Sequence, residues 1–395
     1  MLKRITVTSF KSLENVQVEL GLINVFVGAN GSGKSNLLEA IGVLSAAASG
    51  RVDDEALMRR GVRPGLPKLF KCALKGAPKT PHIVFSAEGD EAGYKVSLFN
   101  PLNDPKPAWR YHTESLTCGG APVASRSHRS GSKLNPEAGF AALKAVDRSE
   151  GDPAQALLNL LREYAIYDPN TPTLRGRTPE GQPREPLGLS GGGLPEAILV
   201  LLRTMKRNPR LAEQFRGFRN LIDWAKSAGS TPSYQLPLSP SATTSRQVVK
   251  FVDRFMSEGR NILSGADASE GALYVLFAAV MTLDERAPKL LAIDNIDHGL
   301  NPRLAQALTK QICSAVVNAE VTRQLLLTSH NPQVLDGLPI NDDRVRLFTV
   351  GRSSTGRTVV RRVELSEKLA KMTDAGWTLS RLWVMGHLGG VPNNV

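Results

Sequence analysis

The stretch Gly28-Ala29-Asn30-Gly31-Ser32-Gly33-Lys34-Ser35 decides the fold of this chain. It matches the pattern G-x-x-x-x-G-K-[S/T] at every fixed position, and it joins an apolar segment, residues 23–27, to a second apolar segment that begins near Lys34. Glycines let backbone N–H groups close around a phosphate, and the amino end of the following helix adds its dipole. A plain glycine turn explains Gly28 and Gly33 but not the pair Lys34-Ser35. The sequence therefore predicts a phosphate-binding loop in which Lys34 neutralises phosphate oxygens and Ser35 ligates Mg²⁺.

Two later apolar segments also end in polar residues. Residues 290–293 lead into Asp294, and residues 325–327 lead into Thr328-Ser329-His330. Because parallel strands bring their carboxyl ends to one edge of a sheet, we expect these side chains beside the phosphate loop. Asp294 then supplies the carboxylate that holds the Mg²⁺ hydration shell. A third motif, Ser269-Glu270-Gly271, opens a strongly apolar helix.

The composition is that of a soluble globular protein. Hydrophobic residues make up 41% of the 395 residues and charged residues 22%, with a formal net charge of +12. The three cysteines, Cys72, Cys118 and Cys313, form no C-x-x-C pair, which favours a reducing cytoplasm. The longest apolar run, residues 271–283, is shorter than the ~20 residues that span a bilayer. We therefore predict a cytoplasmic protein without a membrane span.

The periodicity of the chain predicts four regions. Apolar and polar residues alternate in the first part, which indicates an antiparallel β subdomain, and helical periodicity dominates from residue 153 to about 260. Strand and helix signals then resume at residue 262. We predict an N-terminal lobe over residues 1–118, a basic helical insert over 119–261, a C-terminal lobe over 262–366 and a tail over 367–395. The predicted fold class is α/β, with a mainly parallel core sheet.

Taken in order, the motifs resemble one ATPase family. They are Phe10-Lys11-Ser12, the loop at 28–36, Ser269-Glu270-Gly271, the stretch L-L-A-I-D-N-I-D-H-G-L-N-P from 290 and L-L-L-T-S-H-N-P from 325. This set resembles the ABC-type ATPases that include RecF and SMC heads and the overcoming-lysogenization-defect-like AAA ATPases of phage defence. The resemblance covers residues 1–118 and 262–365. It implies a P-loop fold of the ABC/SMC-head type and the ligands ATP and Mg²⁺.

The resemblance also implies roles for individual residues. Ser269 and Gly271 correspond to the signature motif that reaches the nucleotide of a second subunit, His330 to a sensor of the γ-phosphate and Asp297 to the start of the dimer-interface loop. Lys11 and Ser12 occupy a turn that touches the nucleotide in related heads. The loop residues expected to bind ATP are Gly28, Asn30, Gly31, Ser32, Gly33, Lys34, Ser35 and Asn36.

One position departs from the family pattern. Asn295 stands where the family has a glutamate that polarises the attacking water. An amide orients a water by hydrogen bonding but accepts no proton. We therefore predict that ATP binding is intact and that hydrolysis is slow or depends on Asp297 or His330. The predicted catalytic residues are Lys34, Asp294, Asn295 and His330, and the predicted metal ligands are Ser35 and Asp294.

Two other segments carry a glycine pattern that resembles a known site. Residues 189–193, Leu-Ser-Gly-Gly-Gly, resemble a transporter signature but lack a core helix that leads into the strand at 290, so we interpret them as the loop and cap of a helix from Leu194. Residues 88–90, Glu-Gly-Asp, resemble a nuclease signature, and a hairpin turn is the better interpretation.

Two further features leave alternatives open. A dense basic segment contains Arg203, Lys206, Arg207, Arg210, Arg216 and Arg219. It is a solvated helix face, a contact for the DNA backbone, or a contact for an acidic protein surface. The tail from Trp377 to Val395 packs on the head or docks a partner subunit.

The leading hypothesis is an ATP-dependent sensor and assembly ATPase. It forms a head-to-tail dimer around ATP or a higher homo-oligomer, and it controls a separate effector, a nuclease or toxin, in bacterial antiphage defence. The layout resembles Septu-type and PARIS-type ATPases. The alternatives are a RecF-like repair and recombination ATPase that acts directly on DNA and a nucleotide-gated scaffold that does not hydrolyse ATP.

Overall fold

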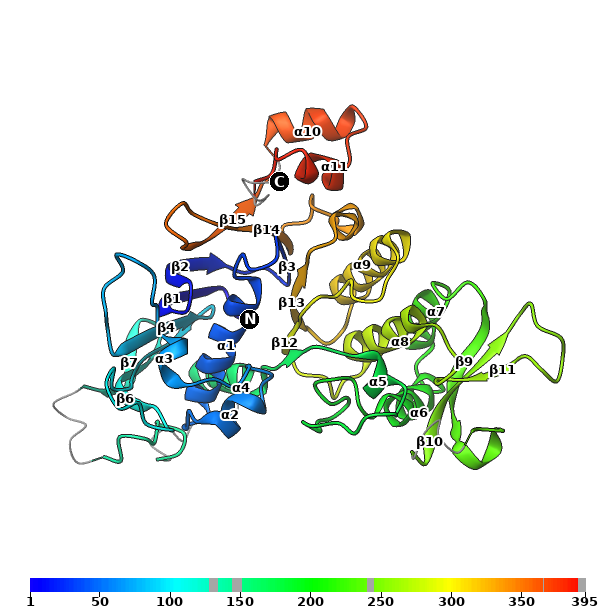
Figure 1. The fold of residues 1–395 in the computed structure, drawn as a ribbon, viewed down its shortest axis with the longest axis horizontal. Coiled ribbons are helices and arrows are strands. Elements are labelled where there is room, and N and C mark those ends of the chain that lie inside the picture. Colours follow the sequence, from blue (N-terminus) through cyan, green and yellow to red (C-terminus); the bar gives the residue numbers. More distant parts are fainter. Residues whose placement is uncertain (128–133, 144–150, 240–244, 365, 390–395) are drawn as a thin grey trace.

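The computed structural model describes residues 1–127, 134–143, 151–239, 245–364 and 366–389. In these residues two six-stranded sheets and one three-stranded sheet are layered with helices (Figure 1). Residues 128–133, which belong to the basic, serine-rich segment 125–133, and the last six residues of the tail, 390–395, lie outside the described part of the chain.

The first six-stranded sheet is antiparallel and forms the N-terminal β subdomain. Its strand order is β2-β1-β4-β5-β6-β7, and its strands are β1 (Arg4–Phe10), β2 (Leu13–Glu19), β4 (His82–Glu88), β5 (Ala92–Phe99), β6 (Arg110–Cys118) and β7 (Ala121–Arg126). The predicted ribbon at the N-terminus is β1 and β2, paired with Ile5 opposite Val18 and Val7 opposite Val16. The predicted turn at 88–90 joins β4 to β5. Alternate residues of β1 and β2 are buried, as the alternating pattern requires.

The second six-stranded sheet is the core of the molecule. Its order is β15-β14-β3-β13-β12-β8, with strands β3 (Ile23–Val27), β8 (Ile166–Tyr167), β12 (Leu290–Ile293), β13 (Gln324–Ser329), β14 (Val345–Arg352) and β15 (Thr358–Val363). All neighbouring pairs are parallel except β14 and β15. Strands β3, β12 and β13 are buried at every residue, which explains their unbroken apolar sequences.

Helices cover both faces of the core sheet. Helix α1 (Lys34–Ala48) lies between the core sheet and the antiparallel sheet, whereas α8 (Glu270–Leu283) and α9 (Pro302–Val317) lie on the opposite face (Figure 1). The expected apolar helix is α8, whose residues 272–282 are all buried. The remaining helices of the described residues are α2 (Asp54–Met58), α3 (Pro67–Phe70), α4 (Pro153–Glu163), α5 (Thr171–Leu174), α6 (Leu194–Met205), α7 (Pro209–Arg219), α10 (Glu367–Asp374), α11 (Leu379–Val384) and the short 3-10 helices η2 (Ser233–Gln235) and η3 (Pro332–Gly337).

The segment predicted as a helical insert, residues 119–261, is only partly helical. Strand β7 belongs to the antiparallel sheet, β8 is the edge of the core sheet, and β9 (Ala225–Pro232) and β10 (Gln247–Asp253) form a third sheet with β11 (Ile262–Ser264). The glycine pair at 119–120 is a hairpin turn between β6 and β7, because both residues have positive φ, 56° and 78°.

The other strands in the segment that was predicted to be helical form because they pair with strands from elsewhere in the fold. The β9 sequence AKSAGSTP lacks a run of β-branched or aromatic residues, so its strand conformation depends on hydrogen bonding to β10. The helix that we predicted from Asn208 to Ala225 is α7, which ends at Arg219. The expected lobe boundaries therefore remain proposals.

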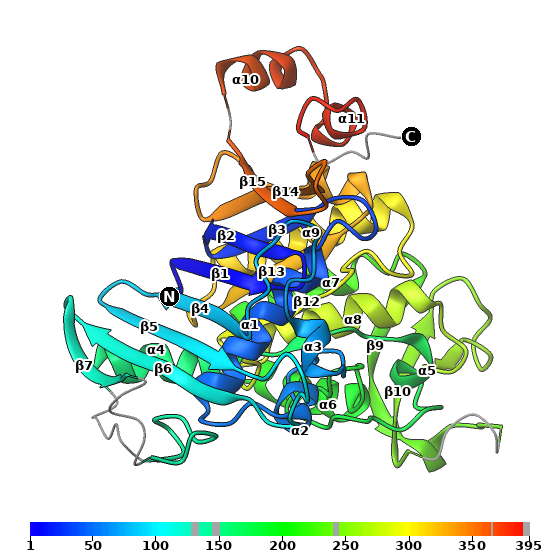
Figure 2. The ribbon, with the colours of Figure 1, turned by 60° about the vertical axis from the view of Figure 1, so that its left-hand side comes forward.

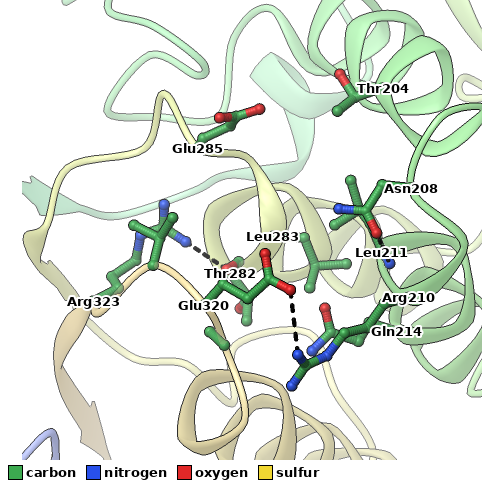
Figure 3. Close-up of a pocket in the computed structure, with 12 residues that line it drawn as sticks. Thr204, Asn208, Arg210, Leu211, Gln214, Thr282, Leu283, Glu285, Glu320 and Arg323 are labelled. Carbon is green, nitrogen blue, oxygen red and sulfur yellow. Dashed lines mark hydrogen bonds and ion pairs between the residues drawn. The ribbon is translucent and has the colours of Figure 1, made fainter.

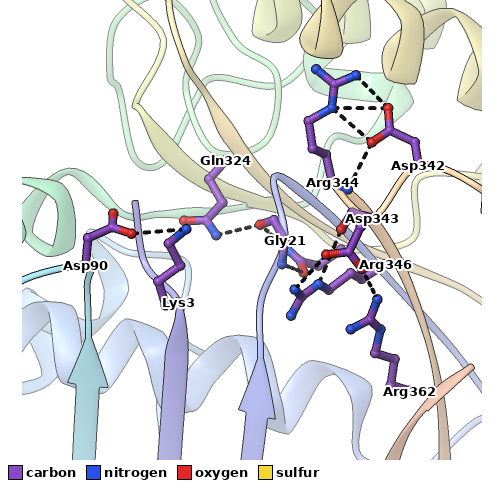
Figure 4. Close-up of polar contacts among 10 residues, drawn as sticks. Lys3, Gly21, Asp90, Gln324, Asp342, Asp343, Arg344, Arg346 and Arg362 are labelled. Carbon is purple, nitrogen blue, oxygen red and sulfur yellow. Dashed lines mark hydrogen bonds and ion pairs between the residues drawn. The ribbon is translucent and has the colours of Figure 1, made fainter. Parts of the chain in front are cut away.

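The amino-terminal ends of the core strands are tied to the N-terminus by polar contacts (Figure 4). The Gln324 carboxamide accepts a hydrogen bond from the Leu2 N–H at 3.1 Å and donates to the Gly21 carbonyl at 2.6 Å. Lys3 forms an ion pair with Asp90 at 3.1 Å. These contacts hold the antiparallel sheet against the edge of the core opposite to the phosphate loop.

The second helix of the tail, α11, packs against the C-terminal lobe at η3, whereas α10 stands away from the sheets (Figure 2). Leu382 is fully buried and Trp383 is 8% exposed, and the Ser380 N–H and hydroxyl both donate to the Asp336 carboxylate at 2.8 and 2.6 Å. This packing agrees with the first of the two interpretations of the tail. In the described residues no helix is both long enough and apolar enough to cross a membrane.

Candidate nucleotide-binding site

The phosphate loop is shaped by two glycines whose neighbours leave no room for a side chain. A Cβ atom on Gly28 would lie 2.0 Å from the Val350 carbonyl oxygen, and one on Gly33 would lie 2.2 Å from Thr358 Oγ1. Gly33 also has φ of 110°, a conformation that side chains disfavour, and it forms the N-cap of α1. The loop therefore needs glycine at both positions for steric reasons as well as for phosphate access.

Lys34 lies folded within the loop. Its ammonium group donates hydrogen bonds to the carbonyl oxygens of Gly28 at 2.7 Å and Ala29 at 3.0 Å, and the residue is 7% exposed. Burial lowers the pKa of Lys34, although the charges of Asp294 and Asp297 oppose the shift. A phosphate oxygen would be a stronger partner for the ammonium group than these carbonyls, because both the donor and the acceptor would then be charged.

The metal-binding residues that we predicted lie together. The Ser35 hydroxyl donates to Asp294 Oδ2 at 2.8 Å, and Thr328 donates from its hydroxyl to the other oxygen, Oδ1. A serine hydroxyl beside a carboxylate, next to a buried lysine, is an oxygen donor set that suits Mg²⁺ bound together with phosphates and water. The residues present therefore fit MgATP, with Ser35 and Asp294 as the protein ligands.

Asn295 has an unusual backbone. Its φ is +54°, in the left-handed region, and its N–H donates to Thr328 Oγ1 at 2.9 Å. Asparagine tolerates this conformation better than most residues, and glutamate does not share this tolerance. The backbone at this position thus accommodates the departure from the family pattern.

Asp297 and His330 come from neighbouring strand ends and face each other. The distance between Asp297 Oδ2 and His330 Nδ1 is 3.6 Å, and the Asp297 side chain is 2% exposed while that of His330 is 51% exposed. The charge of Asp297 acts on Lys34, so the aspartate also lies near the phosphate loop. The structure therefore brings both residues to the same edge as Lys34 and Asp294.

Lys11 and Ser12 lie in the turn between β1 and β2 and contact α1. The Lys11 ammonium group forms an ion pair with Glu39, and burial lowers its pKa despite that partner. Ser12 Oγ accepts a hydrogen bond from Asn36 Nδ2 at 2.8 Å. Glu39 also receives the Arg63 guanidinium at 2.7 Å. These contacts place Lys11, Ser12 and Asn36 on one flank of the loop.

The remaining loop residues differ in exposure. Gly31 and Asn30 are exposed at the tip of the loop, and Gly31 has φ of 75°. Ser32 is buried, and its hydroxyl has no hydrogen-bond partner among the described residues. Arg352 donates from Nε to the Gly31 carbonyl at 2.9 Å, which fastens the tip to β14.

Ser269 and Gly271 lie apart from the loop, at the amino end of α8 on the other face of the core sheet (Figure 1). Ser269 is exposed, and its side chain makes no capping hydrogen bond to the described residues of the helix. The helix start is anchored instead by Glu270, which accepts a hydrogen bond from Thr171, and by Tyr274, whose hydroxyl lies 2.6 Å from His298 Nδ1.

Three residues of the site were absent from the predicted set. They are Asp168, Arg63 and Thr358. Asp168 follows β8, a two-residue strand too short for any periodicity to reveal. Burial raises the pKa of Asp168, and the negative charge of Asp294 raises it further. Thr328 was expected at this edge, because it stands at the end of an apolar strand.

The glycine-rich stretch at 189–193 is a loop that ends at the N-cap of α6, Gly193, which confirms its interpretation as a loop and cap. The Glu180 carboxylate accepts hydrogen bonds from the N–H groups of Ser190 and Gly192, both at 3.0 Å. These N–H groups already have an anionic partner within the chain.

The basic segment lies on α6, α7 and the turn between them. All of its six residues except Arg219 are exposed. Arg210 forms an ion pair with Glu320 at 3.3 Å at the rim of a small pocket of about 130 Å³ between α7 and the end of α9 (Figure 3). The other exposed cations leave this face strongly positive.

Comparison with known proteins identifies the family. A family model described as "AAA domain, putative AbiEii toxin, Type IV TA system" matches residues 23–336. The DNA replication and repair protein RecF of Renibacterium salmoninarum is 44% identical over 69 residues, or 16% of this chain and 17% of that protein. The RecF protein of Phocaeicola vulgatus is 38% identical over 92 residues, or 20% of this chain and 25% of that protein. The chain thus matches a quarter or less of the length of these relatives.

Two solved structures share the fold. An SMC head bound to the C-terminal winged-helix domain of ScpA superimposes with a TM-score of 0.54 at 15% identity, covering 92% of this chain and 98% of that one. The SMC head of Pyrococcus furiosus with an extended coiled coil, bound to the C-terminal domain of ScpA, gives 0.51 at 12% identity, covering 95% and 99%. These matches confirm the predicted fold class. The chain belongs to the AAA-domain family whose model it matches, and it carries the P-loop ATPase fold of SMC heads.

Proposed function

We propose that this protein is a slowly hydrolysing ATPase that dimerises around MgATP and controls a separate effector in bacterial antiphage defence. The observation that carries the ATPase part is the meeting of Ser35 with Asp294 at 2.8 Å beside the buried Lys34. These residues come from two distant parts of the chain, and they form the phosphate and metal half of an ATP site.

The proposed dimerisation rests on the separation of the motif at residues 269–271 from the phosphate loop of the same chain. Ser269 and Gly271 are exposed or half-buried at the amino end of α8, on the other face of the core sheet from α1. A second copy of the chain, turned head to tail, places its own Ser269 opposite the phosphates, where the helix dipole and N–H groups favour negative charge. Two ATP molecules then lie in the interface, and the dimer is stable while ATP is intact.

The role in defence rests on the family and on Asn295. The matching family description names a putative toxin of a type IV toxin–antitoxin system. Asn295 supplies no general base, so the ATP-bound dimer is long-lived, which suits a sensor better than a motor. A Septu-type or PARIS-type arrangement, in which the ATPase scaffold restrains a nuclease or toxin, agrees with these features.

The first experiment tests the ATPase itself. The full chain is assayed for ATP binding, hydrolysis and molar mass, with and without MgATP, and Lys34→Ala serves as the inactive control. We expect binding that Lys34→Ala weakens roughly 30-fold or more, because a hydrogen bond to a charged group contributes about 2–3 kcal/mol. We also expect a dimer that forms only with MgATP. Equal ATP binding by both proteins would contradict the proposal.

The second experiment tests the biological role. The chain is expressed with its neighbouring genes, and cells are challenged with phage. We expect protection that is lost in the Lys34→Ala variant and an effector that co-purifies with the intact protein. No change in phage plating with the complete gene set would exclude the defence role.

A RecF-like action on DNA is the second candidate, favoured by the local identity to RecF and by the exposed cations of α6 and α7. It predicts that double-stranded DNA binds these cations and stimulates ATP hydrolysis. Hydrolysis unchanged by DNA would leave the defence role as the better account. Binding of ATP with no hydrolysis at all would instead indicate a nucleotide-gated scaffold.

A further inference from the structure

The Asp297 carboxylate is a deeply buried acid of the site. The side chain is 2% exposed, and its Oδ1 atom has no hydrogen-bond partner among the described residues. A buried oxygen that lacks a hydrogen bond destabilises the folded state, and more so when the group is charged. A native protein retains such a group where the group has a function that involves a bound molecule.

The surroundings of Asp297 indicate that task. On one side, Oδ2 lies 3.6 Å from His330 Nδ1, and the exposed half of the His330 ring leads to solvent. On the other side, the charge of Asp297 acts on the Lys34 ammonium group, which the loop holds for the terminal phosphates of ATP. The Ile296 N–H donates to the Thr328 carbonyl at 3.0 Å, and β13 pairs with β3, which leads into the phosphate loop. The carboxylate therefore lies on the edge of the sheet that carries this loop, with the half-exposed His330 beside it.

Asn295 cannot perform the same task. Its amide accepts no proton, and its N–H is already committed to Thr328 Oγ1 at 2.9 Å. Asp294 is also engaged, because both of its oxygens accept hydrogen bonds, from Ser35 and from Thr328. Among the described residues, Asp297 is thus the buried carboxylate of this sheet edge that has an oxygen without a hydrogen bond, whereas Asp168, which follows β8, is exposed.

We propose that Asp297, paired with His330 of the same subunit, orients and deprotonates the water that attacks ATP, in place of the glutamate that Asn295 displaces. The inference rests on the proposed ATPase function. The water oxygen forms a bond to the γ-phosphorus while the bond from that phosphorus to the β,γ-bridging oxygen breaks, and ADP leaves with the electron pair. The water proton passes to Asp297 Oδ1 and from there through His330 to solvent, and the products are ADP and inorganic phosphate.

The first test is single-turnover hydrolysis of MgATP, together with equilibrium binding of a fluorescent ATP analogue and thermal melting. Asp297→Asn keeps the size and polarity of the side chain but removes the base. We expect this variant to bind ATP within about twofold of the original protein and to hydrolyse it roughly 100-fold more slowly, the usual contribution of a general base. His330→Gln should slow hydrolysis by about tenfold. Hydrolysis by Asp297→Asn at the original rate would overturn the proposal.

A rescue variant separates chemistry from structural damage. Asn295→Glu restores a carboxylate at the family position, so the double variant Asn295→Glu/Asp297→Asn should recover at least about tenfold of the lost rate. If Asp297→Asn fails to fold, His330→Gln and Asp297→Glu decide the question. The proposal would be overturned if His330→Gln and Asp297→Glu both hydrolysed ATP at the original rate. The glutamine at position 330 and the longer acid at position 297 cannot both preserve the pairing of Asp297 with His330.

A mixing experiment tests whether Asp297 serves its own subunit. Lys34→Ala and Asp297→Asn proteins are each inactive and are combined in equal amounts with MgATP. If Asp297 acts within its own subunit, each mixed dimer lacks a complete site and hydrolysis stays at background. If Asp297 serves the partner's ATP, the mixed dimer contains one complete site and activity returns, which would overturn the proposal.

Failure of this inference is distinguishable from failure of the proposed function. If the original protein does not bind ATP more tightly than Lys34→Ala, the proposed function is wrong. If it binds ATP in a Lys34-dependent manner and does not hydrolyse it above the Lys34→Ala background, the ATP site stands and the role of Asp297 is wrong.

Discussion

The Ser35 hydroxyl donates a hydrogen bond of 2.8 Å to the Asp294 carboxylate across 259 positions of sequence. This contact joins the start of α1 to the end of β12, two elements that are adjacent only because β3, β13 and β12 align in parallel. It marks the place where the two halves of the chain build one site.

Replacement of Asp294 tests the metal side of this contact. Asp294→Asn keeps an oxygen that accepts from Ser35 but removes the negative charge that attracts Mg²⁺. We expect the Mg²⁺ concentration that half-saturates ATP binding to rise roughly tenfold or more, in line with the loss of a residue that orients a metal site. The measurement is a Mg²⁺ titration at fixed ATP analogue, with Asp374→Asn, an exposed aspartate of α10, as the control. An unchanged Mg²⁺ requirement would refute the assignment.

Replacement of Asn295 tests the cause of slow hydrolysis. Asn295→Glu should accelerate phosphate release by about tenfold, because it adds a general base at the family position to the one that Asp297 supplies. The backbone φ of +54° disfavours glutamate, so stability should fall by about 1 kcal/mol. Asn295→Gln shares that backbone cost without the carboxylate and serves as the control. If Asn295→Gln accelerates hydrolysis equally, the effect does not come from a base.

A buried acid in the antiparallel sheet predicts how stability depends on pH. Glu114 is 2% exposed and accepts hydrogen bonds from the Tyr94 hydroxyl at 2.8 Å and the Phe140 N–H. Burial raises the pKa of Glu114 from 4.5 to about 7, and the hydrogen bonds from Tyr94 and Phe140 only partly offset that rise. Between these values the folded protein binds more protons than the unfolded chain, so the contribution of Glu114 to stability falls as the pH rises from about 4.5 to 7.

The variant that tests this pH dependence of stability is Glu114→Gln, which mimics the protonated acid. We expect it to gain stability relative to the original protein as the pH rises, by up to about 3 kcal/mol at pH 8. Urea unfolding at several pH values between 4.5 and 8 provides the measurement. A difference between the two proteins that does not vary with pH would show that Glu114 does not titrate in this range.

The exposed cations of α6 and α7 predict a salt-dependent interaction. If DNA binds this face, the double variant Arg207→Glu/Arg216→Glu should weaken binding at every sequence tested and reduce the slope of log affinity against log salt by about 2, one for each lost phosphate contact. Fluorescence anisotropy with labelled duplexes measures both quantities. Arg361→Glu, on an exposed position of β15, is the charge-matched control for each of the two single variants, Arg207→Glu and Arg216→Glu. Equal effects from Arg361→Glu would show that only net charge matters.

Much of the fold was readable from local sequence. The phosphate loop, the apolar strand before it and helix α8 are specified by glycines at fixed spacing and by unbroken apolar runs, so they were predicted near their observed bounds. Strand β8 and the pair β9 and β10 were not, because two residues give no period and AKSAGSTP has no strand signature. These strands form only when a neighbouring strand supplies their hydrogen bonds.

The features of the site also divide into those that the sequence predicted and those that only the structure showed. The sequence by itself determined which residues have the chemistry of an ATP site, namely Lys34, Ser35 and Asp294, and it showed that Asn295 lacks the usual carboxylate. Only the tertiary structure decided that Asp297 is buried with an unengaged oxygen beside His330. Burial and the lack of a partner are properties of packing between distant segments, and a one-dimensional pattern does not contain them.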